Sequence, residues 1–414
     1  MVSATTPAWG EAPTSRAPGW VYTDPGVYAE ELERFFYRGH WCYVGLECEV
    51  PAVGDFRRSV VGERSVIMVR DTEGEIRVVE NRCAHRGVAF CRERQGHATH
   101  FTCPYHQWTY DLQGRLTGLP FRRGVKRDGE VQGGMPADFK LADHGLTALR
   151  VARRGGLVFA SFDEAVEPFE DFVGPEVLRY VDRVFDGRPL QLLGYNRQRI
   201  PANWKLMQEN IKDPYHPGLL HTWFVTFGLW RADQQSQMWL DRHGRHAAMV
   251  SRRNEGGAAA VTQGVGSFRA DMKLADDRLL DVVPEDWWGG PTVVMTTLFP
   301  SVILQQQVNS LSTRHIRPVA PGVFDFVWTH FGFADDCPEM TRRRLRQANL
   351  FGPAGFVSAD NGEVIEFVQR AFTAHPGART ISELDGLGVQ ATPHMVTETL
   401  IRGMYGYWRE VMGR

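Results

Sequence analysis

One stretch of the chain, residues 83–106, restricts the fold more than any other: CAHRGVAFCRERQGHATHFTCPYH. It contains two short arms, Cys83–His85 and Cys103–His106, and each arm pairs one cysteine with one histidine. Thiolates and imidazoles are common metal ligands in proteins. The fold therefore has to bring two neighbouring loops to a single metal centre.

The order of cysteine and histidine in the two arms helps to identify the metal centre. Structural zinc sites also use two Cys and two His, but usually as a cysteine pair followed by a histidine pair. A Rieske [2Fe–2S] cluster explains mixed arms directly, because one iron takes both thiolates and the other takes both imidazoles. Each loop must then supply one ligand to each iron. The sequence favours the Rieske cluster, with a zinc ribbon as the alternative.

The flanking sequences predict β-hairpins. VIMVRDTEGEIRVVENRC alternates and turns like a hairpin leading into the first arm, and WTYDLQGRLTG repeats this pattern after the second arm. Gly87, Pro104 and Gly114 mark turns. We therefore expect a small β domain around the two arms.

A second candidate metal site lies in residues 203–221, NWKLMQENIKDPYHPGLLH. Positions i and i+3 of a helix share a face, so Asp213 and His216 can approach each other. Pro217 and Gly218 are expected to break the helix after His216, which lets His221 reach the same point from a new turn. Two converging histidines suit a mononuclear iron with a facial triad, which needs one carboxylate from elsewhere.

Length and composition narrow the class of protein. The chain has 414 residues, 43% of them hydrophobic, which is enough for roughly two domains of about 150 residues each. A formal net charge of −2 provides no basic field that would collect nucleic acid or anionic lipid. No apolar run approaches the roughly 18 residues of a membrane helix, and the N-terminus lacks the apolar core of a signal peptide. We therefore expect a cytoplasmic protein.

The remaining cysteines and the lack of a nucleotide-binding motif lead to two further expectations. Cys42, Cys48, Cys91 and Cys337 are interpreted as small hydrophobic residues, because disulfides are unusual in a cytosolic chain. No G-x-G-x-x-G follows a predicted strand, so electrons have to come from a separate reductase.

Taken together, these motifs resemble the large (α) subunit of the Rieske non-haem iron aromatic-ring-hydroxylating oxygenases. The resemblance runs from about residue 20 to the C-terminus. It is strongest to the α subunits that act on aromatic carboxylates, the terephthalate and anthranilate dioxygenases. The segments that carry it are ENRCAHRG, CPYHQWTYDLQG, NWKLMQEN, DPYHPGLLH and RLRQANLFGPAGFVSADNGEVIEFVQR.

The resemblance implies an α+β fold and a set of partners. Residues 1–38 would form an N-terminal segment that packs on the catalytic domain. Residues 39–160 would form a small all-β Rieske domain, and residues 161–414 a larger catalytic domain with an antiparallel sheet covered by helices. A trimeric α ring is implied, either alone or as α3β3 with a small β subunit. An NAD(P)H-dependent reductase, with or without a ferredoxin, would supply electrons.

The resemblance also implies roles for individual residues. The cluster would be held by two residues on each iron: Cys83 and Cys103 on one, His85 and His106 on the other. His216 and His221 would hold the catalytic iron. Asp213 matches a carboxylate that bridges a histidine ligand of this iron and one of a neighbouring subunit's cluster. Asn210, in the NWKLMQEN motif, is a further catalytic candidate.

The third ligand of the catalytic iron departs from the family pattern. It comes from a helix that begins near GPAGF, usually as the second residue of an acidic pair, and here the pair is Asp360-Asn361. Adjacent helical residues point about 100° apart, so only one of them can meet the iron. Register favours Asn361, a neutral amide and a poorer ligand. Asp360 and Glu363 remain the alternatives.

The substrate site is predicted from a strand and the C-terminal helix. Residues 302–319, VILQQQVNSLSTRHIRPV, alternate like a core strand with one face towards a cavity, and they include Arg314. Arg402 lies in TETLIRGMYGYW, on the predicted C-terminal helix. In the terephthalate-like members, two arginines at matching places hold a substrate carboxylate, which a guanidinium binds through two parallel hydrogen bonds. An ordinary salt bridge is the alternative for each. Candidates for lining the ring slot, or for plain core packing, are Val225, Phe227, Leu298 and Phe299.

The implied function is that of a terminal oxygenase α subunit using O2. It would hydroxylate, and in the first instance dihydroxylate, an aromatic carboxylate such as a substituted benzoate. One alternative is monooxygenation or demethylation by the same centres. Another is an electron-transfer or binding subunit whose iron site is impaired by Asn361.

Overall fold

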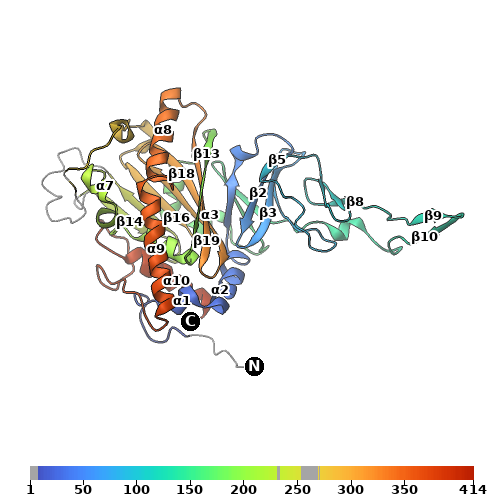
Figure 1. The fold of residues 1–414 in the computed structure, drawn as a ribbon, viewed down its shortest axis with the longest axis horizontal. Helices are drawn as coiled ribbons and strands as arrows, with labels where there is room; N and C mark the ends of the chain where they lie inside the picture. The colour runs from blue at the N-terminus through green and yellow to red at the C-terminus, as the bar shows by residue number, and fades with distance from the viewer. Residues whose placement is uncertain (1–7, 231–233, 253–268, 270) are drawn as a thin grey trace. The chain divides into compact units, whose positions relative to one another are not determined.

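The computed structural model of the chain describes residues 8–230, 234–252, 269 and 271–414 (Figure 1). The chain forms two compact units, one of Tyr37–Val166 and the other of Met1–Phe36 together with Glu167–Arg414. The boundaries expected from the sequence, 39–160 and 161–414, lie a few residues away from this division. Within the described ranges, no helix is both long enough and apolar enough to cross a bilayer.

The unit Tyr37–Val166 consists of short antiparallel strands. Its sheets have the strand orders β4-β3-β2-β5, β1-β12-β11 and β6-β7-β8, with a two-stranded ribbon of β9 and β10. The strands are β1 Cys42–Leu46, β2 Asp55–Val61, β3 Arg64–Arg70, β4 Ile76–Glu80, β5 Gln95–His97, β6 Phe101–Thr102, β7 Thr109–Tyr110, β8 Leu116–Gly118, β9 Val125–Arg127, β10 Glu130–Gln132, β11 Arg150–Arg154 and β12 Leu157–Ser161.

Both hairpins predicted beside the metal arms are confirmed. β3 pairs with β4 and β7 pairs with β8, antiparallel in each case. The two turns are built in the same way. Oδ1 of Asp71 and Oδ1 of Asp111 each accept the backbone N–H groups two and four residues further on, at 2.9–3.0 Å. Gly74 and Gly114 close these turns with φ of +83° and +84°, a conformation that glycine adopts without strain.

The other unit is centred on a seven-stranded antiparallel sheet with the order β13-β19-β18-β17-β16-β15-β14. The predicted single strand over residues 302–319 is wrong, because β17 and β18 form a hairpin that turns at Val308 and Asn309. Val308 has φ of +48°, which is rare for a β-branched residue, and no glycine or proline marks the turn. The strands are β13 Leu190–Ile200, β14 Ser236–Leu240, β15 Ala247–Ser251, β16 Val293–Leu298, β17 Val302–Gln307, β18 Ser310–Ala320 and β19 Val323–Phe333.

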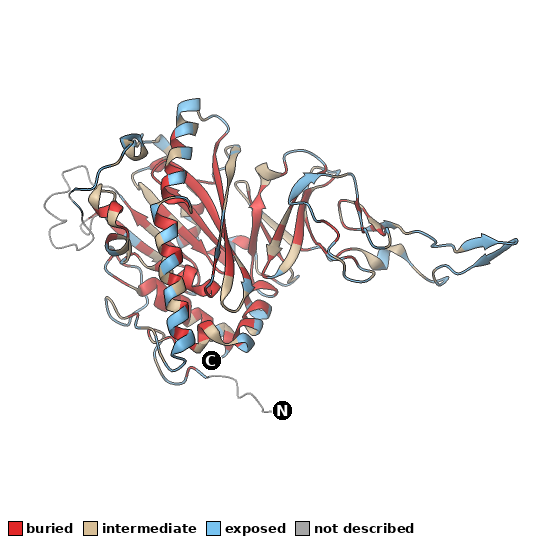
Figure 2. Cartoon of the chain, in the orientation of Figure 1, coloured by how far each residue is buried: buried red, intermediate tan, exposed pale blue. Residues whose placement is uncertain are grey.

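Helices cover this sheet. α5 packs against β16 and β18, α8 packs against β18 and β19, and α9 packs against α5 and α8. Figure 2 shows the strands of the sheet largely buried, while α8 and α9 keep exposed outer faces. The helices are α1 Trp20–Thr23, α2 Pro25–Glu31, α3 Phe169–Val173, α4 Pro175–Asp182, α5 Trp204–Lys212, α6 Pro217–Leu220, α7 Thr222–Thr226, α8 Pro338–Phe351, α9 Phe356–Ala374 and α10 Thr399–Met412.

The N-terminal residues 8–36 belong to the same unit as this sheet. α1 contacts α9, and Nζ of Lys205 in α5 forms a buried ion pair with Oε1 of Glu31 at 2.8 Å. Of the cysteines interpreted as small hydrophobic residues, Cys42 and Cys91 are buried. Cys337 is exposed at the start of α8, so that interpretation is wrong for this residue.

Candidate metal centres and substrate cavity

The two arms have matching backbone conformations. The N–H groups of Cys83 and Cys103 donate to the carbonyl five residues further on, at 2.9 Å in both loops. The carbonyl groups of the same two cysteines accept the N–H four residues further on, also at 2.9 Å. Gly87 and Gln107, at equivalent positions, both have positive φ, +72° and +57°. The sequence therefore folds each arm into the same tight loop, and the β3–β4 and β7–β8 hairpins support them.

The four candidate ligands gather at the tips of these loops. Cys83 and Cys103 are buried, with exposed fractions of 2% and 1%. The imidazole rings of His85 and His106 lie 4.6 Å apart between centroids, and both residues are partly exposed. The Nδ1 atoms of both histidines are buried and have no hydrogen-bond partner among the residues described. Unpaired buried ring nitrogens are rare in folded proteins, so these atoms are available as ligands.

The thiols have the surroundings of buried sulfur ligands. Sγ of Cys83 lies 3.2 Å from the hydroxyl of Tyr110, which can donate to a sulfur ligand. Burial raises the pKa of the Cys103 thiol and, together with the charge of the neighbouring His106, lowers the pKa of His85. One thiol and one imidazole from each loop provide two donors for each of two irons, as a Rieske cluster needs.

The second candidate centre begins where α5 ends. Asp213 follows the last helical residue, and its Oδ1 accepts the backbone N–H groups of Tyr215 and His216 at 2.7 and 3.2 Å. The prediction that Asp213 and His216 lie on one helix is therefore wrong. An Asp-centred turn brings them together instead, with Oδ2 of Asp213 3.3 Å from Nδ1 of His216.

Pro217 also has a different role from the one expected. It is the first residue of α6, a position where a proline has no N–H to lose, so it starts a helix and does not end one. His221 follows at the junction of α6 and α7. The single short helix between the two histidines, α6, therefore returns His221 towards His216, and the centroids of their rings lie 5.5 Å apart.

His216, His221 and Asn361 line one cavity. His221 and Asn361 are almost fully buried, at 1% and 3% exposed. Asn210 also lines the cavity, and its amide donates to Oδ1 of Asn361 at 3.3 Å. Two imidazoles and one amide thus face the same space, which is the donor set of a non-haem iron triad with its carboxylate replaced by an amide.

A carboxylate lies behind each of the two imidazoles. Oδ2 of Asp213 is 3.3 Å from Nδ1 of His216, and Oδ2 of Asp360 is 3.1 Å from Nδ1 of His221. Such a carboxylate orients the ring and leaves Nε2 for a metal. Burial is the main reason that the pKa of His221 falls to about 3, so its ring is neutral at pH 7 and has a lone pair to donate.

These positions separate the three candidates for the third iron ligand. Asn361 lines the cavity, Asp360 faces the Nδ1 side of His221, and Glu363 is exposed to solvent. The role of Asp360 behind the ring was not foreseen from the sequence, because it depends on how α9 meets the α6–α7 junction.

Arg314, on β18, lines the same cavity and is 1% exposed. Its guanidinium lies over the ring of Trp328 at 4.0 Å, while its Nε and Nη2 are buried and have no hydrogen-bond partner within the described part of the chain. Burial lowers the pKa of Arg314 to about 9, so the side chain remains a cation at neutral pH. An unpaired buried charge is costly, which makes the cavity a site for an anion.

The structure does not bring the second predicted arginine into the cavity. Arg402, on α10, donates to the backbone carbonyls of Ser382, Leu384 and Gly388 at 2.9–3.0 Å, and it does not line the cavity. Its guanidinium ties the segment 382–388 to α10. The expectation that Arg402 holds a substrate is therefore not supported by its position.

The apolar wall of the cavity also differs from the sequence-based candidates. Val225, Phe227, Leu298 and Phe299 do not line it. No local pattern marks the residues that do, since they lie on α7, on the segment after it, on β14–β16 and on the chain around 357 and 395. The apolar lining side chains include Phe224, Leu229, Trp230, Met238, Met249, Val250, Val293, Met295, Val357 and Met395.

Comparison with known protein families supports both centres. One family model, the Rieske [2Fe-2S] domain, matches residues 40–148, and another, the ring hydroxylating alpha subunit (catalytic domain), matches residues 179–414. The second match alone covers more than half of the chain. The chain belongs to the ring-hydroxylating oxygenase α subunits. The predicted enzyme class, Rieske [2Fe–2S] cluster and mononuclear non-haem iron are confirmed for this α subunit.

Individual relatives of the α subunit are similar over nearly their whole length. The chain is 67% identical over 408 residues to the salicylate 5-hydroxylase large oxygenase component of Ralstonia sp, covering 98% of this chain and 96% of the relative. It is 40% identical to a terephthalate 1,2-dioxygenase α subunit of Comamonas sp, covering 98% and 97%. A crystal structure of naphthalene 1,2-dioxygenase from Rhodococcus sp. superposes with a TM-score of 0.77 at 25% identity, covering 96% and 94%. The predicted α+β fold class is confirmed.

Proposed function

We propose that this α subunit is the terminal oxygenase of a system that hydroxylates an aromatic carboxylate of the salicylate class. One observation supports a carboxylate group on the substrate. The cavity that holds His216, His221 and Asn361 also contains Arg314, a buried cation whose Nε and Nη2 have no hydrogen-bond partner among the residues that the structure describes. A carboxylate would supply that counter-ion through a two-point hydrogen bond, and the apolar wall would hold the ring. The 67% identity to a salicylate 5-hydroxylase component points to the same class of substrate.

The same identity changes which outcome we favour. The sequence alone placed dihydroxylation first and monooxygenation second, but a relative of this similarity acts as a 5-hydroxylase. We therefore infer that one oxygen atom enters the ring and the other leaves as water. Turnover of salicylate under 18O2 tests this, because a product with one labelled hydroxyl supports it and a product with two labelled oxygens overturns it.

The metal ligands are assigned as follows. Cys83 and Cys103 would hold one iron of the cluster, and His85 and His106 the other. His216, His221 and Asn361 would hold the mononuclear iron, which supplies O2 activation when bound. Asn210 would position the amide of Asn361 through its hydrogen bond.

Electrons would reach the iron from another subunit. We propose a trimeric ring of α subunits, with or without a small β subunit, in which the cluster of one subunit faces the iron of its neighbour. Asp213, whose Oδ2 lies 3.3 Å from Nδ1 of His216, would accept a hydrogen bond from a cluster histidine of that neighbour. An NAD(P)H-dependent reductase, directly or through a ferredoxin, would reduce the cluster.

The substrate assignment is tested by Arg314→Gln. We expect KM for salicylate to rise roughly 30-fold or more, since losing a desolvated charge pair costs about 2–5 kcal/mol. The control is salicylamide, whose neutral group lacks the charge, and its KM should change far less. Equal changes for the acid and the amide would remove Arg314 from the substrate site.

An electron-transfer subunit without a working iron is the remaining alternative, because Asn361 is a weak ligand. Metal analysis of the purified protein decides between them. An oxygenase should contain about three irons per chain, and an electron-transfer subunit about two.

A further inference from the structure

A row of hydroxyl and carboxyl groups crosses the catalytic unit towards the end of α5. Its members come from four separate parts of the chain: Thr380, Tyr22 in α1, Tyr405 in α10 and Glu209 in α5. None of them lines the cavity or belongs to the metal ligands assigned above. The proposed function therefore leaves this row without a role.

The row is continuous. The Tyr405 hydroxyl donates to Oε1 of Glu209 and lies 2.7 Å from the Tyr22 hydroxyl. The side chains of Glu209 and Thr380 both shift the pKa of Tyr22, so they lie close to its hydroxyl. Tyr22 and Tyr405 are 0% and 1% exposed, while Thr380 and Glu209 are partly exposed. The middle of the row is thus closed to solvent, and among its four members only Thr380 and Glu209 retain exposed atoms.

Each member can hold a proton and pass it on. Loss of hydration is the main cause that raises the pKa of Glu209 to about 7, opposed by the two tyrosine hydrogen bonds and Lys205 and assisted by Asp213. Burial and the Glu209 charge raise the pKa values of Tyr22 and Tyr405, so these hydroxyls keep their protons. A carboxyl group that titrates near the working pH is suited to repeated proton transfer.

The inner end of the row lies beside the metal centre. Glu209 lies in the last turn of α5, and Asp213 directly follows the helix. The charge of Asp213 contributes to the raised pKa of Glu209, so the two carboxyl groups interact electrostatically. Asp213 in turn contacts Nδ1 of His216. Glu209 is therefore coupled to the carboxylate behind a cavity imidazole.

We propose that Thr380, Tyr22, Tyr405 and Glu209 form a proton path that supplies the oxygenase reaction. The proposal rests on the proposed function. Ring hydroxylation consumes one O2, two electrons and two protons for each product, whether the second oxygen leaves as water or stays on the ring. The reductase supplies the electrons, and solvent supplies the protons. Each hydroxyl that gives up its proton on the inner side regains one from the outer side, so the chain is unchanged after turnover.

The proposed trimer explains why protons would need an internal path. If the cluster of a neighbouring subunit docks at Asp213, it covers the end of α5. Direct access of bulk water to Glu209 would then be restricted. Thr380 is partly exposed, so in this proposal it is the member of the row that takes protons from solvent.

The test compares two matched variants of the full-length enzyme, assayed with its reductase. Tyr405→Phe removes a hydroxyl from the row, and Tyr407→Phe removes a hydroxyl from the same helix that interacts with Arg245 instead. We expect Tyr405→Phe to lower kcat roughly tenfold or more with little change in KM, and to change the solvent deuterium isotope effect on kcat. Tyr407→Phe should leave both quantities near their wild-type values.

A second test measures how kcat depends on pH in the wild type and in a Glu209 variant. In the wild type, kcat should fall as pH rises through about 7, because Glu209 loses the proton that it has to donate. Glu209→Gln cannot titrate, so this limb of the pH profile should disappear and kcat should be low throughout. A limb that persists unchanged in Glu209→Gln contradicts the path.

The outcomes distinguish a failure of the proton path from a failure of the proposed function. A wild-type enzyme that hydroxylates no aromatic carboxylate overturns the proposed function. An active wild type in which Tyr405→Phe and Tyr407→Phe have the same kcat and isotope effect overturns the proton path alone. Should Tyr405→Phe fail to fold, as judged by circular dichroism and cluster absorbance, Tyr22→Phe interrupts the same row and is judged by the same measurements.

Discussion

Asn361 gives the iron site a neutral donor at the position where a facial triad has a carboxylate. Asn361→Asp adds a negative charge next to the metal, so iron should be bound more tightly. We expect the variant to retain more mononuclear iron after treatment with a chelator and to form more product, with unchanged cluster absorbance because the cluster ligands lie elsewhere. Iron content and product yield measure both effects.

Asp360→Ala is the matched comparison at the neighbouring residue. It removes the carboxylate behind His221 but leaves the cavity donors in place. Loss of such a partner typically costs 10–100-fold in metal affinity or activity, so iron should be weakened but still measurable. If Asp360→Ala abolishes iron binding while Asn361→Asp changes nothing, then Asp360 is the ligand and Asn361 is not.

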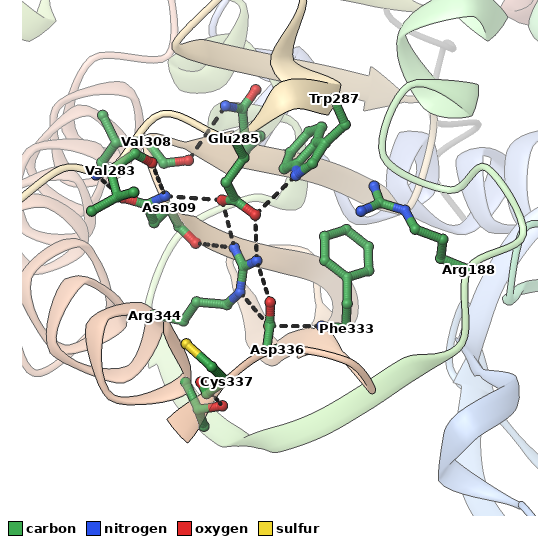
Figure 3. A network of polar contacts seen from close by, with 12 residues as sticks. Arg188, Val283, Glu285, Trp287, Val308, Asn309, Phe333, Asp336, Cys337 and Arg344 are labelled. Carbon is green, nitrogen blue, oxygen red and sulfur yellow. Dashed lines mark hydrogen bonds and ion pairs between the residues drawn. The ribbon is translucent and has the colours of Figure 1, made fainter. Parts of the chain in front are cut away.

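At the scale of elements, α8 is held by the ion network around Arg344 (Figure 3). Nε of Arg344 contacts Asp336 at 2.6 Å, Nη2 contacts Glu285 at 2.7 Å, and Nη1 donates to the carbonyl of Asn309 at 2.7 Å. Arg344 and Asp336 are nearly buried, at 1% and 8% exposed, so removing the guanidinium leaves carboxylates without their partner. Arg344→Ala should therefore lower the free energy of unfolding by about 3–5 kcal/mol.

The control for this network lies on the same helix. Arg342 pairs with Glu339 on the surface, where its side chain is 63% exposed, and Arg342→Ala should cost less than about 1 kcal/mol. Urea unfolding of both variants measures the difference. Similar losses in the two variants would show that the buried network contributes no more than a surface pair.

Asp71, in the turn between β3 and β4, should make the free energy of unfolding depend on pH. Burial opposes ionisation of Asp71, but hydrogen bonds from Arg77, from two backbone N–H groups and from Gln113 outweigh it and lower the pKa of Asp71. Because the folded pKa lies below the unfolded value of about 3.9, the ionised group stabilises the fold above about pH 4. This stabilisation is lost as pH falls through the folded pKa.

Asp71→Asn isolates that contribution. At pH 7 it should lower the free energy of unfolding by about 1–3 kcal/mol, because it removes charge-assisted bonds to Arg77. The difference between wild type and variant should shrink as pH falls below about 4, which denaturant unfolding at several pH values measures. A difference that stays constant with pH would mean that the charge of Asp71 has no part in it.

At the scale of the whole molecule, the proposed ring predicts complementation between inactive subunits. Cys83→Ser should lose the cluster, and His216→Ala should lose the mononuclear iron. If the cluster of one subunit reduces the iron of its neighbour, trimers assembled from both variants on co-expression should regain part of the activity. Product formation by the co-purified mixture measures this. Persistent inactivity of verified mixed trimers would place electron transfer within a single chain.

The amino-acid sequence determined the metal chemistry and the local hairpins. The two mixed arms leave few coordination choices, since thiolates and imidazoles bind a restricted set of metals at restricted spacings. The turns at Asp71 and Asp111 depend on side chains that bond to their own backbone, so a short stretch of sequence is sufficient to predict them. The family, the fold class and the cofactors followed from such local signals.

The tertiary structure decided which side chains share a space. Arg314 and Arg402 were equal candidates in the sequence. In the described part of the structure, Nε and Nη2 of Arg314 have no hydrogen-bond partner in the cavity, whereas Arg402 donates to backbone carbonyls. In the sequence, the alternation of residues 302–319 continues through Val308 without a glycine or proline. Only the structure shows that a hairpin turns there. These outcomes depend on contacts between residues far apart in the chain, and the burial that sets their pKa values and pairing exists only once the helices have packed on the sheet.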